Sequence, residues 1–135
     1  MTSSVFEFDV YYDDTDAGGV MYHANYLKYA EHARTNFLKN IGFSNTYFLN
    51  SEKPVGFVVR QASLTYIQPA KLEDRVTVET NVKEMTGATI LFEQIFKKGE
   101  TVLVTADILV ACVNAKIRPT RLPQELREKI SDCLS

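Results

Sequence analysis

The spacing of hydrophobic residues changes character along the chain. The first segment, 5–12, mixes β-branched and aromatic residues in partial alternation and predicts a strand. From His23 the apolar residues recur at spacings of three and four, which predicts a helix of about 18 residues. Gly42 follows the last periodic residue, where a helix-ending glycine belongs. The main apolar positions of this helix are Leu27, Ala30, Phe37, Leu38 and Ile41.

The chain is rich in β-strand patterns after Pro54. In the second of the predicted strands, Val76, Val78, Thr80 and Val82 fall on one face. Gly99-Glu100 is typical of a hairpin turn. The predicted strands cover 55–67, 74–85, 88–98 and 101–115. A short turn or single helical turn is expected over 43–53, and a terminal helix over 123–134.

This order of elements indicates the fold class. One long helix between a first strand and a run of later strands is typical of an α+β protein, not of a doubly wound fold. The helix is apolar on more than one side, so a sheet must wrap around it. We therefore expect a hot-dog fold, with a curled antiparallel sheet of about five strands around one central helix, in a single domain over 1–135.

Composition narrows the class of protein. The chain is 45% hydrophobic and 24% charged, which is typical of a folded domain, and its net charge of -2 argues against nucleic-acid binding. The two cysteines make neither a disulfide framework nor a zinc site, and Cys112 lies in an apolar run that predicts burial. The N-terminal sequence MTSSVFEFDV does not resemble a signal peptide. Because no apolar stretch reaches the ~20 residues of a membrane span, we expect a soluble cytoplasmic protein.

Candidate chemistry is concentrated in the stretch YYDDTDAGGVMYHANY. Asp16 is followed two and three residues later by Gly18 and Gly19. These glycines permit unusual backbone conformations and a close approach by a ligand. The two apolar residues that follow predict partly apolar surroundings for Asp16, in which a carboxylate acts as a general base or nucleophile. The alternative is a solvated turn aspartate, the interpretation given to Asp13 and Asp14.

Two further residues of this stretch are candidates. His23 opens the predicted helix, and the free N–H groups at a helix start stabilise a developing negative charge. A capping or interface histidine is the alternative, and with no neighbouring His or Cys it indicates no metal site. Tyr12 is interpreted first as a packed aromatic residue, and second as a hydrogen-bond donor to the Asp16 carboxylate or to a substrate.

The pattern Asp-x-x-Gly-x-x-x-His-x-x-Tyr that starts at Asp16 resembles the 4-hydroxybenzoyl-CoA thioesterase family. Within it, the chain is most similar to the bacterial acyl-CoA thioesterases associated with the Tol-Pal system. The segments FVVRQASLTYIQPAKLEDRVTVET and IRPTRLP also resemble that branch, so the resemblance covers nearly the whole chain.

The resemblance implies a hot-dog homodimer that pairs into a tetramer and hydrolyses acyl-CoA, or acyl groups on acyl carrier protein, without a metal or cofactor. It makes Asp16 the catalytic aspartate, acting as a nucleophile or on a water. It makes the backbone amide of His23 the group that polarises the thioester carbonyl. Tyr12 and the His23 side chain match positions implicated in the Tol-Pal-associated branch.

Coenzyme A carries phosphates, so a thioesterase of this kind needs basic residues. The candidates are Arg60, Lys71, Lys116, Arg118 and Arg121, each of which is otherwise an ordinary solvated residue. Arg34 is expected to pair with Glu31, three residues before it. Two other functions remain open: a hot-dog dehydratase, disfavoured because no second His–carboxylate pair is evident, and a non-catalytic acyl-thioester-binding or scaffold protein.

Overall fold

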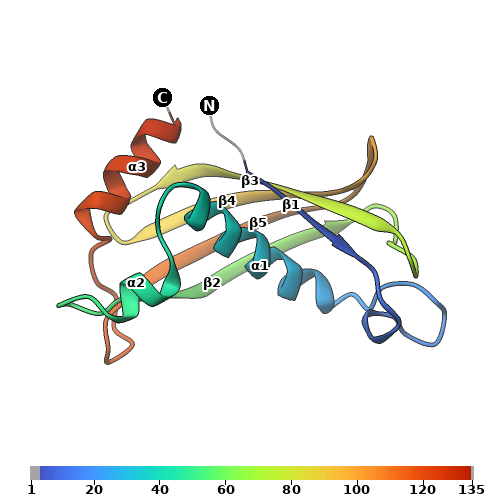
Figure 1. The fold of residues 1–135 in the computed structure, drawn as a ribbon, viewed down its shortest axis with the longest axis horizontal. Helices are drawn as coiled ribbons and strands as arrows, with labels where there is room; N and C mark the ends of the chain where they lie inside the picture. The colour runs from blue at the N-terminus through green and yellow to red at the C-terminus, as the bar shows by residue number, and fades with distance from the viewer. Residues whose placement is uncertain (1–3, 135) are drawn as a thin grey trace.

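One antiparallel sheet forms the body of the protein (Figure 1). The computed structural model describes residues 4–134, and the two ends of the predicted domain, 1–3 and 135, lie outside the described residues. The sheet consists of β1 (Ser4–Asp9), β2 (Gly56–Tyr66), β3 (Arg75–Met85), β4 (Thr89–Lys98) and β5 (Thr101–Val113). Their order is β1-β3-β4-β5-β2, so β1 and β2 are the edge strands.

Three α-helices accompany the sheet: α1 (Asn25–Asn40), α2 (Asn45–Leu49) and α3 (Gln124–Leu134). Figure 1 shows α1 lying across one face of the sheet with α2 beside its end. The predicted α+β hot-dog architecture is therefore confirmed. None of the helices in the described part of the chain is long and apolar enough to cross a membrane.

The helix α1 packs on the sheet through one buried row of residues spaced by four, three and four: Tyr26, Ala30, Ala33 and Phe37. Two of them are alanines, which let the helix backbone approach the sheet closely. Its end is fixed by Gly42, which has a φ of 98°. The Gly42 N–H donates to the Lys39 carbonyl (3.0 Å) and the Phe43 N–H to the Leu38 carbonyl (2.8 Å), which confirms the predicted helix-ending glycine.

The strands follow the alternation in the sequence. The four residues of β3 that were predicted to lie on one face, Val76, Val78, Thr80 and Val82, are all buried. The strands β2 to β5 begin and end within two residues of the predicted positions. The first strand, however, ends at Asp9, because residues Tyr12–Asp14 form a 3-10 helix, η1. Helix α1 likewise begins at Asn25 and not at His23. Cys112 is fully buried as predicted, and burial raises the pKa of its thiol to about 11.

The connection between β2 and β3 differs most from the expected run of short turns. It crosses from one side of the sheet to the other over residues 67–74, because β2 pairs with β5 and β3 with β1 and β4. On the way its Ala70 carbonyl accepts from the Met21 N–H (2.8 Å), and the Ala70 N–H donates to the Tyr26 hydroxyl (3.0 Å). The crossover thus supports the segment that leads into α1.

Candidate active site

The loop between η1 and α1 is a closed turn. Thr15 and Met21 form an antiparallel bridge at its base. Above the bridge, the Asp16 N–H donates to the Val20 carbonyl (3.0 Å), and the Gly19 N–H donates to the Asp16 carbonyl (3.1 Å). Gly19 has a φ of 79°, which side-chain-bearing residues rarely adopt. The turn itself therefore requires Gly19, whatever else this residue does for a ligand.

Asp16 presents an exposed carboxylate on this turn. Its Oδ1 accepts from the Gly18 N–H (2.8 Å), and a Cβ on Gly18 would lie only 3.3 Å from that oxygen. Among residues 4–134, no group donates a hydrogen bond to Oδ2, so this oxygen is available to a ligand. The predicted partly apolar surroundings are wrong for the single protomer, because Met21 turns into the core, where it is 3% exposed.

Helix α1 begins without a side-chain cap. Its N-cap residue is Ala24, which has no side-chain acceptor. In the described part of the chain the N–H groups of His23 and Ala24 have no hydrogen-bond partner, whereas the Asn25 N–H already donates to the Tyr22 carbonyl (2.9 Å). Two adjacent open amides at a helix start can bind a developing negative charge.

A pocket of about 220 Å³ lies beside His23, at the start of α1. His23, Tyr26 and Tyr66 line it together with residues 67–69 of the crossover, but Asp16 does not line it. The Tyr66 hydroxyl donates to the His23 carbonyl (3.2 Å), which fixes the chain just before α1. The His23 ring is exposed beside the rings of Tyr22 and Tyr66, with centroids 4.7 and 6.4 Å away.

Asp14 is the residue that the sequence interpretation placed wrongly. It is 1% exposed and not solvated. Its Oδ1 accepts from Asn25 Nδ2 (3.0 Å) and Lys28 Nζ (3.2 Å), and its Oδ2 accepts from the Tyr11 N–H (3.0 Å) and the Tyr29 hydroxyl (2.8 Å). Lys28 and Tyr29 follow Asn25 by three and four residues, so the three side chains project from one side of α1. This row of donors is the signal that could have revealed a carboxylate against the first turn of α1.

Tyr12 also differs from its first interpretation. Its side chain is 83% exposed, so it is not a packed aromatic residue in the protomer. No described residue receives a hydrogen bond from its hydroxyl, and only its backbone carbonyl is engaged, by Thr15. The second interpretation, contact with a substrate, remains a prediction.

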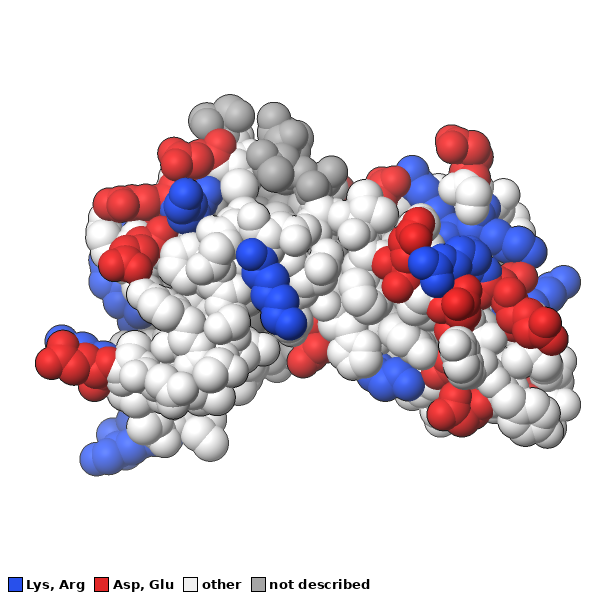
Figure 2. All heavy atoms as spheres, in the orientation of Figure 1, with Lys and Arg blue, Asp and Glu red and all other residues white. Residues whose placement is uncertain are grey.

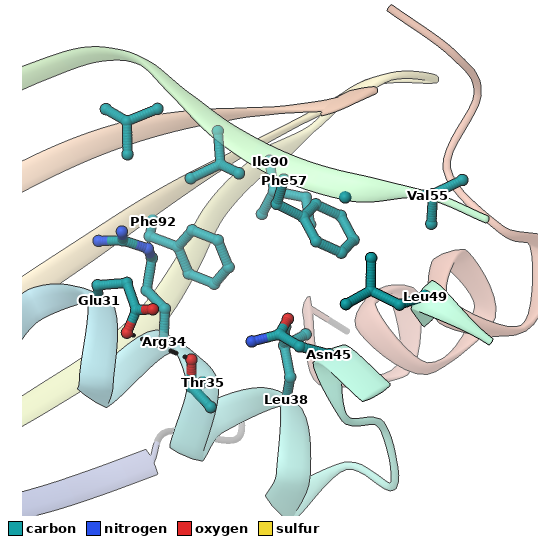
Figure 3. Close-up of a pocket in the computed structure, with 13 residues that line it drawn as sticks. Glu31, Arg34, Thr35, Leu38, Asn45, Leu49, Val55, Phe57, Ile90 and Phe92 are labelled. Carbon is teal, nitrogen blue, oxygen red and sulfur yellow. Dashed lines mark hydrogen bonds between the residues drawn. The ribbon is translucent and has the colours of Figure 1, made fainter. Parts of the chain in front are cut away.

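A larger cavity of about 320 Å³ lies between the second half of α1, α2 and the β2 side of the sheet (Figure 3). Figure 3 shows Phe57 and Phe92 on the sheet side, Leu38 on α1 and Leu49 on α2 forming its apolar walls. Glu31, Arg34 and Thr35 form its polar end.

The expected pair of Arg34 and Glu31 is wrong. Arg34 Nη1 donates to Oε1 of the buried Gln94 on β4 (3.0 Å), while Glu31 accepts from the Thr35 hydroxyl (3.5 Å). No described carboxylate lies within ion-pair distance of Arg34. Burial lowers the pKa of the Arg34 guanidinium, although the charge of Glu31 acts in the opposite direction.

The basic candidates are separated from Asp16 within one protomer. Lys116 and Arg118 belong to the turn after β5, where their N–H groups donate to Asn114 Oδ1 (2.9 and 3.2 Å). Figure 1 shows that this turn and the loop before α1 lie at opposite ends of the molecule. Arg121 follows that turn and lies beside Gly87, between β3 and β4.

Two basic candidates lie elsewhere. Arg60 stands at the β-bulge of β2, where the pairing register shifts between Val59 and Gln61. Lys71 forms a bridge with Val20, so it is the basic candidate next to the Asp16 loop. Residues 4–134 hold no group of three or more His, Cys, Asp or Glu side chains that could bind a metal ion.

Comparison with known proteins identifies the family. Residues 10–130 match the model of the thioesterase-like superfamily. The acyl-CoA thioesterase YbgC of Haemophilus influenzae is 45% identical over 123 residues, 90% of each chain, and the acyl-CoA thioester hydrolase YbgC of Escherichia coli is 38% identical over 130 residues, 93% of this chain and 96% of that one. The crystal structure of a probable thioesterase from Bartonella henselae is 36% identical, has a TM-score of 0.88, and covers 90% of this chain and 100% of its own. The chain therefore belongs to the thioesterase-like superfamily and, within it, to the YbgC-type thioesterases.

Proposed function

We propose that the chain forms a single thioesterase domain that hydrolyses acyl-CoA to a free acid and coenzyme A. The observation that carries this proposal is the arrangement of Asp16, which keeps one oxygen free, on a loop that runs directly into the open amides of His23 and Ala24. The names of the Haemophilus and Escherichia relatives support the same reaction. Acyl groups on acyl carrier protein are the alternative substrate.

In this mechanism the thioester carbonyl oxygen accepts hydrogen bonds from the open amides at the start of α1. The carbonyl carbon then faces Asp16. Either Asp16 attacks it, the C–S bond breaks and water hydrolyses the resulting anhydride, or Asp16 removes a proton from a water that attacks instead. In both cases the negative charge on the carbonyl oxygen is stabilised by the amides, each worth about 3 kcal/mol in such sites.

The leaving group needs little help. Coenzyme A leaves as a thiolate, and a thiol has a pKa near 8.5, far below that of an alcohol. A strong general acid is therefore unnecessary. The exposed Tyr12 hydroxyl and the His23 ring are free to contact the substrate and orient it.

We also propose that the active unit is a homodimer formed through the edge strand β2. This strand has no partner on its outer side in the described chain, and Val58, Val59 and Tyr66 on it are 39%, 49% and 49% exposed. Figure 2, in the orientation of Figure 1, shows the charged side chains gathered mostly toward the two ends of the molecule, with one basic side chain in the largely uncharged area between them. A long exposed edge with apolar residues is a template for strand pairing. Pairing of such dimers into a tetramer stays a prediction.

Two-fold pairing of β2 is antiparallel, so the start of the strand in one copy lies beside the end of the strand in the other. The end of β2 carries Tyr66, next to His23. We refer to the turn after β5 with Lys116 and Arg118, together with Arg121 just after it, as the basic turn. Val113, which precedes it, pairs with Gly56 at the start of β2. The dimer therefore brings the basic turn of one copy toward the Asp16 loop of the other, where phosphates of coenzyme A can be bound.

Replacement of Asp16 by Asn tests the proposal. Asn keeps the shape and can still accept from the Gly18 N–H, but it is neither a base nor a good nucleophile. We expect kcat for thiol release from acyl-CoA, followed with a thiol-reactive dye, to fall about 100- to 10,000-fold. The melting temperature and substrate binding should stay close to those of the parent.

The matched control is Asp13→Asn, because Asp13 is also exposed, three residues away in the same segment. It should keep the parental kcat. If Asp16→Asn stays within a few-fold of the parent, the proposed mechanism is wrong. Binding of acyl-CoA without thiol release by the parent, at every chain length tried, favours a scaffold instead.

A further inference from the structure

Asp14 joins the segments that meet at the proposed site. Its carboxylate holds Tyr11 on one side and the first turn of α1 on the other, through Asn25, Lys28 and Tyr29. Its backbone carbonyl accepts from the Tyr22 N–H (2.8 Å). Both ends of the loop that carries Asp16 are therefore attached to this one buried residue. We refer to Asp14 with these partners as the Asp14 clamp.

The carboxylate of the Asp14 clamp is held in its ionised form, and both of its oxygens accept hydrogen bonds. Burial alone would raise the pKa of the Asp14 carboxyl, but the Tyr11 amide, the Tyr29 hydroxyl and the Lys28 ammonium outweigh it and hold the pKa below its usual value. The same contact raises the pKa of the Tyr29 phenol, chiefly because burial and the donated hydrogen bond disfavour the phenolate. Hydrogen bonds to an ionised acceptor are shorter and stronger than neutral ones.

The clamp also explains how α1 can start without an N-cap. A capping side chain would occupy the first amides of the helix, whereas Ala24 leaves them open. Asp14 lies against the first turn from outside the helix, where negative charge is favourable. It does so through side chains, so the amides of His23 and Ala24 stay free.

We propose that Asp14 is a positioning residue for the thioesterase reaction, which fixes the Asp16 carboxylate relative to the amides of His23 and Ala24. This inference rests on the proposed function. Misplacement of a reacting group by about 1 Å costs roughly 100-fold in rate, although substrate binding elsewhere is untouched. The clamp therefore acts on kcat through Asp16, without contact with the substrate.

The first test is Asp14→Asn, which keeps the shape but replaces an ionised acceptor by a neutral amide. We expect kcat to fall about 10- to 100-fold while KM changes little. Tyr29→Phe removes a single donor and keeps the ring stacked on Phe8 (centroids 3.7 Å apart), so it should give a smaller loss in the same direction and serves if Asp14→Asn does not fold. The stability control is Ile130→Val in α3, a fully buried position, which should lower the melting temperature and leave kcat at the parental value.

A double-substitution cycle separates this inference from the proposed function. If Asp14 acts through Asp16, the variant with both Asp14→Asn and Asp16→Asn is no slower than Asp16→Asn alone. If Asp16→Asn is inactive while Asp14→Asn matches the parent in kcat, Asp14 has no positioning role and the inference is overturned. If Asp16→Asn is active and a folded Asp14→Asn is not, Asp14 does not act through Asp16, and both the inference and the proposed function fail.

Discussion

At the scale of single residues, substitutions of His23 can separate the contribution of its backbone amide from that of its imidazole. Replacement by Ala removes the imidazole but keeps the amide that the mechanism assigns to the carbonyl oxygen. We therefore expect His23→Ala to lower kcat by only about 10-fold or less, far less than Asp16→Asn. His23→Pro removes the N–H itself and should cost a further factor of roughly 100. Kinetics together with circular dichroism of both variants check this. A loss for His23→Ala equal to that for Asp16→Asn would make the side chain a direct participant.

The two aspartates of the opening stretch show how far single residues could be read from the sequence. The glycines after Asp16 correctly marked a tight turn, since Gly19 adopts a positive φ. The solvated position expected for Asp14 and the packed position first expected for Tyr12 were wrong, because burial depends on which other segments pack against a residue. Asp14 is covered by a helix that begins eleven residues later, and Tyr12 lies outside the protomer core.

At the scale of elements, the end of α1 is a test of local backbone chemistry. Gly42 has a φ of 98° and no atom near its missing Cβ, so the cost of a side chain there is conformational and not steric. We expect Gly42→Ala to destabilise the protein by about 1–2 kcal/mol and to lower the melting temperature by about 3–8 °C.

Gly87→Ala is the matched control for this change, because its Cβ would make only ordinary contact with Arg121 and its φ is not positive. Thermal unfolding followed by circular dichroism gives both values. An unchanged melting temperature in Gly42→Ala would mean that the left-handed helix end contributes nothing to stability.

The boundaries of β2 to β5 were predictable because alternation in the sequence reports which face is buried, as in the row Val76, Val78, Thr80 and Val82. Their neighbours were not. An alternating pattern says that one face is covered but not which strand lies alongside, so the pairing of β2 with β5 and the crossover over 67–74 came only from the structure. That crossover carries Ala70, whose backbone supports the loop before α1.

At the scale of the whole molecule, the distribution of charge argues for a shared site. Within one protomer the basic turn and the Asp16 loop lie at opposite ends (Figure 1), and the edge strand β2 connects the two regions. The sequence contained the basic residues but not their distance from Asp16, because that distance depends on the direction in which β2 runs across the sheet. In the proposed dimer, a two-fold axis through the β2 edge would bring the basic turn of one copy toward the Asp16 loop of the other.

Heterodimers test this directly. One tagged copy carries Asp16→Asn and the other carries Lys116→Ala, Arg118→Ala and Arg121→Ala. If the basic turn serves the partner's site, one of the two sites combines the intact Asp16 of the second copy with the intact basic turn of the first, and the other site lacks both. The heterodimer should therefore keep about half the parental activity at low acyl-CoA concentration. The reciprocal control places all four substitutions on one copy opposite a parental copy. In that arrangement the Asp16 of the parental copy shares its site with the substituted basic turn of the other copy, so activity should fall well below half of the parental value. The opposite ranking of the two heterodimers would place the basic turn and Asp16 of one site in the same protomer, against the proposed dimer.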